Sequence, residues 1–250
     1  MVPYRDLILP KPNDQLYVYS NFVQTIDGKI QTKTKKLEHW PIGSPADYQG
    51  LLELRARADV LIHGRQTATW TRTIDNLGKP EFLALRAKHG LDRPILYVVL
   101  SAHPNQKLLS YLTNPPGNVE VLLATARSAR LTRAWQSVRA KRFGTTRVEI
   151  KPLFEFLRQA GYRRILVEGG PAVLRQVLDA DLLDELFLTI APKLFGGTSA
   201  ETLDLLSGPL YPSSTVKTAK LINLFSVEDE VYLRYQMKKG GAHAGSNTKN

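Results

Sequence analysis

The stretch from Arg163 to Arg175, RRILVEGGPAVLR, constrains the fold of this chain more than any other. Its apolar run at 165–167 has the length of a buried strand, and Glu168 and two glycines follow it directly. Pro171 then stands at a favourable first helical position. The apolar residues after it recur with helical spacing: Val173, Leu174, Val177 and Leu178. A strand that passes through glycines into a helix N-terminus presents backbone N–H groups to an anion such as a nucleotide phosphate. The stretch therefore predicts a strand–helix unit of an α/β fold, with Glu168 facing the same opening.

The rest of the chain repeats this alternation of strand-like and helix-like stretches. Short runs rich in β-formers predict strands at 16–23, 58–63, 94–100, 119–124, 146–150 and 186–190. Helical spacing predicts helices from Ser44-Pro45 to 58 and at 66–70, 80–89, 107–112, 131–142 and 152–160. Polar loops are expected after residue 23 and at 72–79. Because parallel strands joined by helices form sheets covered on both faces, we expect a mixed, mostly parallel sheet.

The C-terminal part of the chain changes character. Strands at 216–224 and 231–237 flank a charged turn, Glu228-Asp229-Glu230, and predict an antiparallel hairpin. We therefore expect one α/β domain at residues 16–238, after an extended N-terminal arm at residues 1–15. Residues 239–250 are polar and have no periodicity, which predicts a disordered tail.

Composition excludes several classes of protein. The chain has no cysteine, so disulfides, Cys-ligated zinc and thiol catalysis are excluded, and an intracellular, cytoplasmic protein is favoured. Its histidines are isolated, so we expect no metal site. The longest apolar run, 95–100, is far shorter than the roughly 20 residues that span a bilayer. Pro3, Pro10 and Pro12 interrupt the N-terminus, which is therefore no secretory signal.

The formal net charge of +11 has two possible explanations. One is a nucleic-acid surface, and the other is a solvated basic face with a site for phosphorylated small molecules. The densest basic stretch, Arg127 to Arg147, contains no acid, and only Trp135 and Phe143 place aromatic rings among its arginines. Because no nucleic-acid-binding motif accompanies it, we expect a small-molecule partner and no nucleic acid.

Two further turns can place functional groups at the carboxyl edge of the sheet, where α/β proteins bind ligands. Asp27-Gly28-Lys29 is either a common turn pair or an acid and an amine at that edge. Gly64-Arg65-Gln66-Thr67 repeats the strand–Gly–helix pattern, in which Arg65 could bind a phosphate. The same residues are also typical of an ordinary capped short helix without a ligand. The three-glycine dinucleotide fingerprint and the Walker loop are absent, so a standard Rossmann domain is not expected.

Three segments, in this order and spacing, resemble one family. They are NFVQTIDGKI (21–30), LRARADVLIHGRQT (54–67) and ILVEGGPAVLRQVLDADLLDELFLTIAPKLFGG (165–197). The family is the pyrimidine reductases of riboflavin biosynthesis, found as the C-terminal half of bifunctional deaminase/reductases and related in fold to dihydrofolate reductase. The resemblance implies that fold, NADPH as cofactor and a cytoplasmic homodimer. It also implies reduction of a 5-amino-6-(5-phosphoribosylamino)uracil-type substrate to its ribitylamino form.

The resemblance also implies roles for individual residues. Lys29 and Glu168, with Asp27 nearby, are expected to orient the substrate and assist proton transfer, and Arg55 is expected to contact the substrate. The expected cofactor contacts are Val23, Gly64, Thr67, Ser101, Gly169, Gly170, Pro171, Ala172, Val173 and Leu174. For the 2′-phosphate of NADPH we add Arg127 and Ser128, on the basis of charge and their position after the strand at 119–124.

One segment departs from the family pattern. Relatives commonly follow the Gly-x-x-Thr turn with Asp-x-Pro-x-Leu-x-x-Arg, whose arginine holds the substrate phosphate, whereas this chain reads TWTRTIDNLGKPEF. The basic residues that could replace that arginine are Arg72, Lys79, Lys33, Lys35 and Lys36. A reductase of the same fold acting on another heterocycle, such as a pterin, is therefore an alternative.

Overall fold

The computed structural model describes residues 1–10, 13–32, 42–71, 73–116 and 118–239. Within them, the main sheet has nine strands in the order β10-β11-β8-β1-β7-β3-β4-β5-β6. These strands are β1 (Tyr17–Thr25), β3 (Val60–Gly64), β4 (Ile95–Leu100), β5 (Val119–Thr125), β6 (Ala140–Arg142), β7 (Arg164–Gly169), β8 (Glu185–Ala191), β10 (Ala219–Val227) and β11 (Glu230–Met237). From β8 to β6 each neighbouring pair is parallel, whereas β11 is antiparallel to both β8 and β10. The expected sheet with its C-terminal antiparallel hairpin is confirmed.

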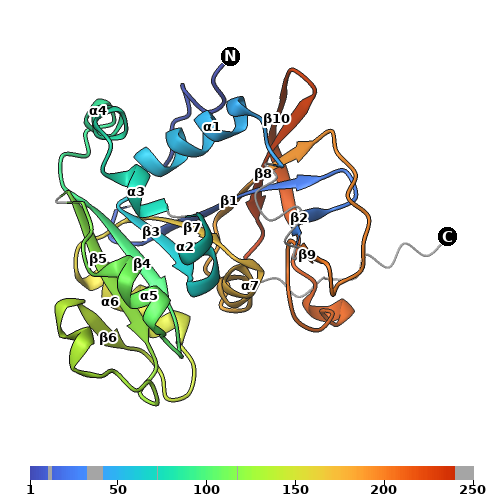
Figure 1. The fold of residues 1–250 in the computed structure, drawn as a ribbon. Coiled ribbons are helices and arrows are strands. Elements are labelled where there is room, and N and C mark those ends of the chain that lie inside the picture. Colours follow the sequence, from blue (N-terminus) through green and yellow to red (C-terminus); the bar gives the residue numbers. More distant parts are fainter. Residues whose placement is uncertain (11–12, 33–41, 72, 117, 240–250) are drawn as a thin grey trace.

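Helices cover both faces of this sheet (Figure 1). They are α1 (Pro45–Ala56), α2 (Arg65–Thr71), α3 (Thr73–Leu77), α4 (Pro80–Lys88), α5 (Gln106–Leu112), α6 (Ile150–Gln159) and α7 (Pro171–Asp179). Because side chains alternate along a strand, each strand contributes to both cores. On β3, Leu61 packs in the core that contains residues of α1, α4 and α5. Its neighbour Ile62 packs in the core that contains residues of α6 and α7.

Helix α1 begins where the sequence predicts, at Ser44-Pro45. The Ser44 hydroxyl oxygen accepts hydrogen bonds from the backbone N–H groups of Ala46 and Asp47, at 3.1 and 3.2 Å. The same hydroxyl donates to Glu230 Oε2 at 2.6 Å. Because Glu230 begins β11, the N-cap also fixes the start of α1 to the C-terminal hairpin.

Two predicted elements are wrong. Residues 131–142, predicted as one helix, form a short 3-10 helix, η2 (Arg133–Ser137), followed by β6. The Leu123 N–H donates to the Arg139 carbonyl at 2.9 Å, so backbone pairing with β5 overrides the helical spacing there. Residues 146–150, predicted as a strand, form a bend in which the Glu149 N–H bonds the Phe143 carbonyl, and α6 begins at Ile150.

The predicted polar loops contain regular structure. The loop at 72–79 includes α3, and the loop after residue 23 includes β2 (Lys29–Thr32). Strand β2 pairs with β9 (Thr202–Asp204) in a small antiparallel sheet. Neither strand carries a run of β-formers, and their partners are far apart in sequence, so only the fold brings them together.

The N-terminal arm packs against the C-terminal hairpin and the neighbouring strand β8. The Tyr4 ring packs edge-on against Phe187, Phe225 and Tyr232, with ring centroids 5.2, 5.7 and 6.0 Å away. The predicted tail at 239–250 lies, except for Lys239, outside the described residues. Among the residues described, no helix combines the length and apolar character needed to cross a bilayer.

Candidate functional site

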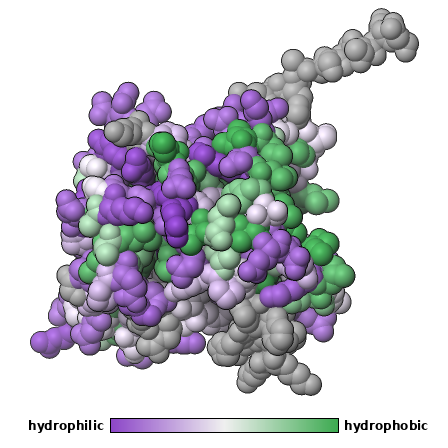
Figure 2. Space-filling model, turned by 90° about the horizontal axis from the view of Figure 1, so that it is seen from above, coloured by the Kyte–Doolittle hydropathy of each residue, from purple (hydrophilic) through white to green (hydrophobic). Residues whose placement is uncertain are grey.

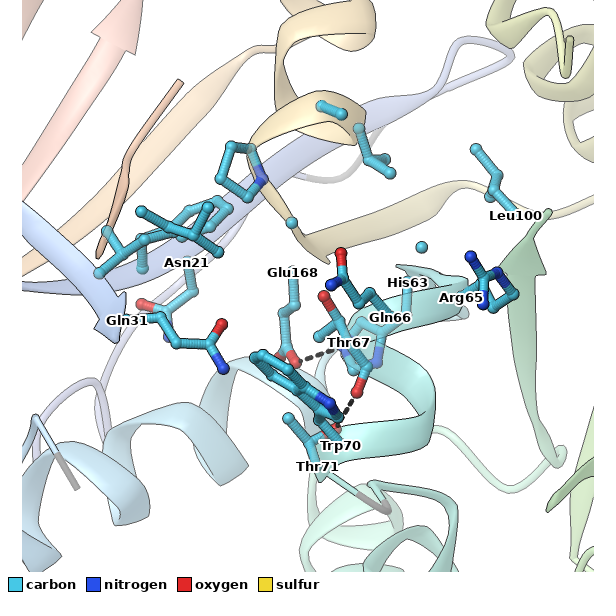
Figure 3. Close-up of a pocket in the computed structure, with 18 of the residues that line it drawn as sticks. Asn21, Gln31, His63, Arg65, Gln66, Thr67, Trp70, Thr71, Leu100 and Glu168 are labelled. Carbon is cyan, nitrogen blue, oxygen red and sulfur yellow. Dashed lines mark hydrogen bonds and ion pairs between the residues drawn. The ribbon is translucent and has the colours of Figure 1, made fainter. Parts of the chain in front are cut away.

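A cavity of about 610 Å³ opens at the carboxyl ends of β1, β3, β4 and β7. Helices α1 and α2 and the N-terminus of α7 form its walls, and β2 adds Gln31. In Figure 3, Asn21 and Gln31 lie on one side of Glu168, and Arg65 and Leu100 lie on the other. Open α/β sheets bind ligands at this edge, and the volume suits a small molecule or cofactor.

The carboxylate of Glu168, at the end of β7, lies at the centre of the cavity wall. Arg55 on α1 donates Nε to Oε1 at 2.8 Å and Nη2 to Oε2 at 2.6 Å. These two side chains are only 5% and 6% exposed. His63 on β3 places Nε2 3.0 Å from Oε2, and its Nδ1 lies 3.0 Å from the Tyr97 hydroxyl. Side chains of α1 and β3 therefore hold Glu168 in one orientation, and Tyr97 on β4 holds the His63 ring.

Glu168 is ionised in this arrangement. Burial by itself raises the pKa of Glu168, but Arg55 and His63 outweigh burial and lower the pKa to about 2. Burial also lowers the pKa of His63, so its imidazole is neutral near pH 7. We assign the Nε2–H tautomer, which donates to Glu168 and lets Nδ1 accept from Tyr97. Glu168 is therefore a fixed acceptor of hydrogen bonds rather than a proton donor.

The two oxygens of Glu168 differ in how many donors they already have. Oε2 receives Arg55 Nη2, His63 and a longer contact from Arg55 Nε, whereas Oε1 receives only Arg55 Nε from the described residues. Each carboxylate oxygen can accept two hydrogen bonds. Oε1 can therefore accept an N–H or O–H group of a ligand in the cavity.

The turn from β7 into α7 lets neighbouring groups approach its backbone closely. Gly169 and Gly170 are joined by a cis peptide bond, and Gly169 has φ of 131°, a region that favours glycine. A Cβ at Gly169 or Gly170 would lie 3.2 or 3.4 Å from Thr67 Oγ1 on α2. Behind this turn α7 begins at Pro171, and its positive dipole end borders the cavity.

The lining fits a phosphate-bearing dinucleotide. A Cβ at Gly64 would lie 3.2 Å from Val173 Cγ2 and 3.6 Å from the Gly169 carbonyl, so the turns after β3 and β7 meet backbone to backbone. Ser101 and Asn21 are lining residues, and Ser101 Oγ and Asn21 Oδ1 are buried without a hydrogen-bond partner in the described part of the chain. Glycine turns, a helix N-terminus and unpaired polar atoms together suit a pyrophosphate and its adjoining amide or hydroxyl groups.

Most of the residues predicted for the site lie together in this cavity. Those that line it are Val23, Arg55, Gly64, Thr67, Ser101, Glu168, Gly170, Pro171, Ala172 and Val173. Gly169 adjoins them in the β7–α7 turn. Leu174, by contrast, is only 1% exposed and packs in the core between α7 and the sheet.

The Asp27-Gly28-Lys29 turn lies beside the cavity and does not line it. The Asp27 carboxylate is held by Thr25 and by the backbone N–H groups of Phe195 and Gly196, which lower its pKa to about 2. Lys29 Nζ bonds Asp204 at 2.7 Å across the β2–β9 pair. In this structure both side chains stabilise the loops around the cavity.

The basic residues predicted to bind phosphate groups either lie away from the cavity or fall outside the described residues. Arg127 and Ser128 lie outside the cavity, with their N–H groups bonded to the carbonyls of residues 144 and 145. Lys79 is exposed at the start of α4 and does not line the cavity. The candidates Arg72, Lys33, Lys35 and Lys36 lie outside the described residues. Arg147, in the segment between β6 and α6, lines the cavity instead.

Several cavity residues were not predicted. They are Asn21, Asp47, His63, Trp70 and Arg147. A sequence signal exists for Asn21 and His63, because each is a polar residue at an inward-facing position of a buried strand. Arg147 was hidden by the wrong strand prediction at 146–150. No local pattern marks Asp47 or Trp70.

A cavity with these glycine turns and a helix N-terminus, in an α/β chain without the three-glycine fingerprint, is suited to a dinucleotide outside the Rossmann pattern. Residues 16–222 match the RibD C-terminal domain family. The 2,5-diamino-6-ribosylamino-4(3H)-pyrimidinone 5′-phosphate reductase of Methanothermobacter thermautotrophicus is 30% identical over 189 residues, which are 75% of this chain and 82% of the relative. The protein of the same name from Archaeoglobus fulgidus is 27% identical over 188 residues, covering 75% of this chain and 85% of the relative.

Solved structures show the same fold. A pyrimidine reductase-like protein from Corynebacterium diphtheriae superposes with a TM-score of 0.69 at 23% identity, covering 90% of this chain and 93% of that one. The riboflavin biosynthesis reductase Rib7 of Saccharomyces cerevisiae superposes with a TM-score of 0.58 at 19% identity, covering 95% of both chains. This chain belongs to the RibD C-terminal domain family, as the sequence motifs predict, and this family of reductases implies a nicotinamide cofactor.

Proposed function

We propose that this protein is an NADPH-dependent oxidoreductase of riboflavin biosynthesis, which reduces a ribosylaminopyrimidine 5′-phosphate to its ribitylamino form. The observation that carries the proposal is the ionised Glu168, fixed beside a glycine turn suited to a dinucleotide in a cavity of sufficient size. The names of the two relatives, both pyrimidinone 5′-phosphate reductases, support the same reaction.

The reaction needs a pyrimidine held still while its sugar opens. The C1′–O4′ bond breaks, the exocyclic nitrogen forms a double bond to C1′ and loses its proton, and O4′ gains one. The nicotinamide supplies a hydride to C1′, and a proton adds to the nitrogen. Glu168 Oε1, the oxygen with spare acceptor capacity, would accept an N–H or O–H of the substrate and orient it.

The position of the cofactor follows from the glycine turns. Gly64, Gly170 and the N-terminus of α7 would hold its pyrophosphate, and the unpaired Ser101 hydroxyl would hydrogen-bond its sugar or amide groups. Residues of α1 and α2 would lie on either side of the bound reactants, since both helices line the cavity.

NADPH rather than NADH is supported by the charge of one wall. Arg65 and Arg147 both line the cavity and are exposed toward solvent, away from the ion pair of Glu168. Arginine forms charge-assisted hydrogen bonds with phosphate, so these two residues would hold the 2′-phosphate. They take the role predicted from charge for Arg127 and Ser128.

A homodimer is also part of the proposal. Strand β10 is the edge of the main sheet, and its side chains Leu221, Ile222 and Leu224 are exposed. Figure 2 shows apolar residues gathered on the side of the molecule that carries the C-terminal elements. Exposed edge strands of this kind favour pairing with another chain. The cytoplasmic location and the absence of a nucleic-acid partner stay predictions.

A turnover assay separates the proposal from its rivals. NADPH oxidation should depend on a ribosylaminopyrimidine 5′-phosphate and should not occur with dihydrofolate. Turnover of dihydrofolate alone would instead support the pterin alternative. Tight DNA or RNA binding that weakens steeply with salt, together with no NADPH binding, would favour a nucleic-acid-binding protein.

A further inference from the structure

Helix α1 presents two charged residues to the cavity, and the proposed function uses only one of them. Asp47, Leu51 and Arg55 are spaced four residues apart, so they form one stripe along the helix, and all three line the cavity. Arg55 is engaged by Glu168. Asp47 lies two turns away at the other end of the stripe, and the proposed reaction gives it no role.

The surroundings of Asp47 leave room for a carboxylate at this point. A Cβ at Gly43 would overlap the Asp47 carboxyl group, so only glycine at residue 43 lets the side chain occupy its place. The Thr189 side chain, on β8, lies near the same carboxyl group, and its hydroxyl is buried without a hydrogen-bond partner among the described residues. The backbone N–H of Asp47 is fixed by the Ser44 cap, which Glu230 holds in turn. Two neighbouring elements and the cap therefore position this carboxyl group at the cavity wall.

The titratable neighbours of Asp47 do not neutralise it. Burial raises the pKa of Asp47 to about 6, and the nearby charge of Glu230 on β11 acts in the same direction, while Thr189 opposes them. Burial also raises the pKa of Tyr4 on the N-terminal arm and of Tyr232 on β11, so both phenols are uncharged. Asp47 is therefore mostly ionised at neutral pH and presents two acceptor oxygens.

An ionised carboxylate matches only one of the two possible pyrimidine substrates. A 2-amino-4(3H)-pyrimidinone carries two adjacent donors, the 2-amino group and N3–H, which a carboxylate can bind in a paired, two-point contact. The corresponding uracil has a carbonyl oxygen at C2, which would face a carboxylate oxygen with no hydrogen between them. Leaving such buried polar groups unpaired is how sites reject close analogues strongly.

We propose that Asp47 binds the 2-amino and N3–H edge of the substrate and makes this protein a reductase of the diaminopyrimidinone rather than of the aminouracil. This inference rests on the proposed function for the reaction itself. It assigns to Asp47 a contact with substrate and to Gly43 the space that the contact needs.

A purely structural role for Asp47 predicts a different result. An acid in the first turn of a helix stabilises the helix dipole, and its loss would weaken the fold without regard to substrate. Such a loss lowers turnover of both pyrimidines by the same factor. Substrate recognition instead changes the ratio of the two.

The test compares the two substrates in wild type, Asp47→Asn and the matched control Asp181→Asn, which changes an exposed aspartate paired with Lys217. The wild type and the control should prefer the diaminopyrimidinone phosphate in kcat/KM. Asp47→Asn should lower that preference about tenfold or more, because an amide offers only one acceptor. Gly43→Ala should also lower this preference, and it provides the test if Asp47→Asn does not fold. Equal losses on both substrates, or an unchanged ratio, would overturn the inference.

A binding measurement keeps the inference separate from the proposed reaction. Calorimetry with NADP⁺ present compares 2,6-diaminopyrimidin-4-one with 6-aminouracil, which has a carbonyl in place of the 2-amino group and a hydrogen on N1. Wild type should bind the former more tightly, with an advantage that declines as the pH falls through about 6 and that Asp47→Asn removes. If this holds while neither phosphorylated substrate is turned over, the proposed function is wrong and the assignment of Asp47 stands. Equal binding of the two fragments, or binding of neither, overturns the assignment.

Discussion

Arg55 and Glu168 form a buried pair in which each charge depends on the other. Their shortest contact is 2.6 Å, and both side chains are almost completely buried. Removing one partner leaves the other as an unpaired buried charge, which is far more costly than losing a pair in water. The proposed substrate acceptor, Glu168, and the stability of this part of the fold are therefore coupled at the level of single residues.

Arg55→Ala is expected to lower the free energy of unfolding by about 3–5 kcal/mol, because it leaves Glu168 uncompensated. Denaturant unfolding of wild type and variant measures this difference. The control is Arg158→Ala, which removes an exposed pair with Glu155 and should change the free energy of unfolding far less. A loss for Arg55→Ala no larger than for the control would contradict the description of the pair.

The lowered pKa of Glu168 predicts how stability depends on pH. The pKa falls from 4.5 to about 2 on folding, so the ionised carboxylate contributes stability that is fully present above pH 4.5. That contribution, about 3 kcal/mol, is lost as the pH falls through the folded pKa. Unfolding free energies measured between pH 5 and pH 2 should therefore decline more steeply in wild type than in Glu168→Gln. Parallel declines in the two proteins would show that Glu168 is not held ionised.

Arg147 and Arg127 provide a matched test of the 2′-phosphate site. Arg147→Gln is expected to weaken NADPH binding about tenfold or more and to leave NADH binding nearly unchanged, because one charge-assisted contact is lost. Arg127→Gln should change neither, since that side chain lies outside the cavity. Fluorescence titration with both cofactors measures the four dissociation constants. A larger effect for Arg127→Gln would restore the assignment made from charge alone.

At the scale of elements, the β7–α7 unit carries the site because strand, turn and helix are contiguous. Gly169 combines a φ of 131° with close approach to Thr67 on α2. Gly169→Ala is expected to cost about 1–3 kcal/mol of stability and to weaken NADPH binding. The control Gly161→Ala has a similar positive φ but open space around it, and it lies away from the cavity. That control should lose stability while binding NADPH as wild type does; a loss of binding in both would indicate general unfolding.

The elements that the sequence predicts are those with a local signal. Strand β7 and helix α7 follow from an apolar run, two glycines and a proline within a short stretch, and Ser44-Pro45 marks the start of α1. Strands β2, β6 and β9 were missed because their stability comes from partners distant in sequence. The same distinction holds for the residues of the site. Glu168 lies in a local sequence motif, whereas only the three-dimensional fold brings Asp47 and Arg147 to the cavity.

At the scale of the whole molecule, charge is distributed unevenly around one cavity. Glu168 and Asp47 contribute carboxylates to its lining, and Arg65 and Arg147 contribute guanidinium groups, which we propose as the sites for heterocycle and phosphate, respectively. The net charge of +11 therefore favours anionic ligands without requiring a nucleic-acid partner.

The exposed strand β10 leads to a prediction about assembly. Leu224→Asp should convert a homodimer into a monomer, because Leu224 is 57% exposed on the edge strand and a charge there opposes pairing. Light scattering after size-exclusion chromatography measures the mass of each species. The control Leu83→Asp, on the exposed side of α4, should leave the dimer intact. A monomeric wild type, or a dimer that survives Leu224→Asp, would contradict an interface at β10.

The most direct test of the central claim is transfer of a labelled hydride. The protein is incubated with NADPH that carries deuterium at both C4 positions of the nicotinamide and with 2,5-diamino-6-ribosylamino-4(3H)-pyrimidinone 5′-phosphate, and the product is examined by mass spectrometry and NMR. We expect a ribitylamino product with one deuterium at C1′, which Glu168→Gln should form much more slowly. Substrate that remains unreduced, or a product without deuterium at C1′, would contradict a nicotinamide-dependent reductase centred on Glu168.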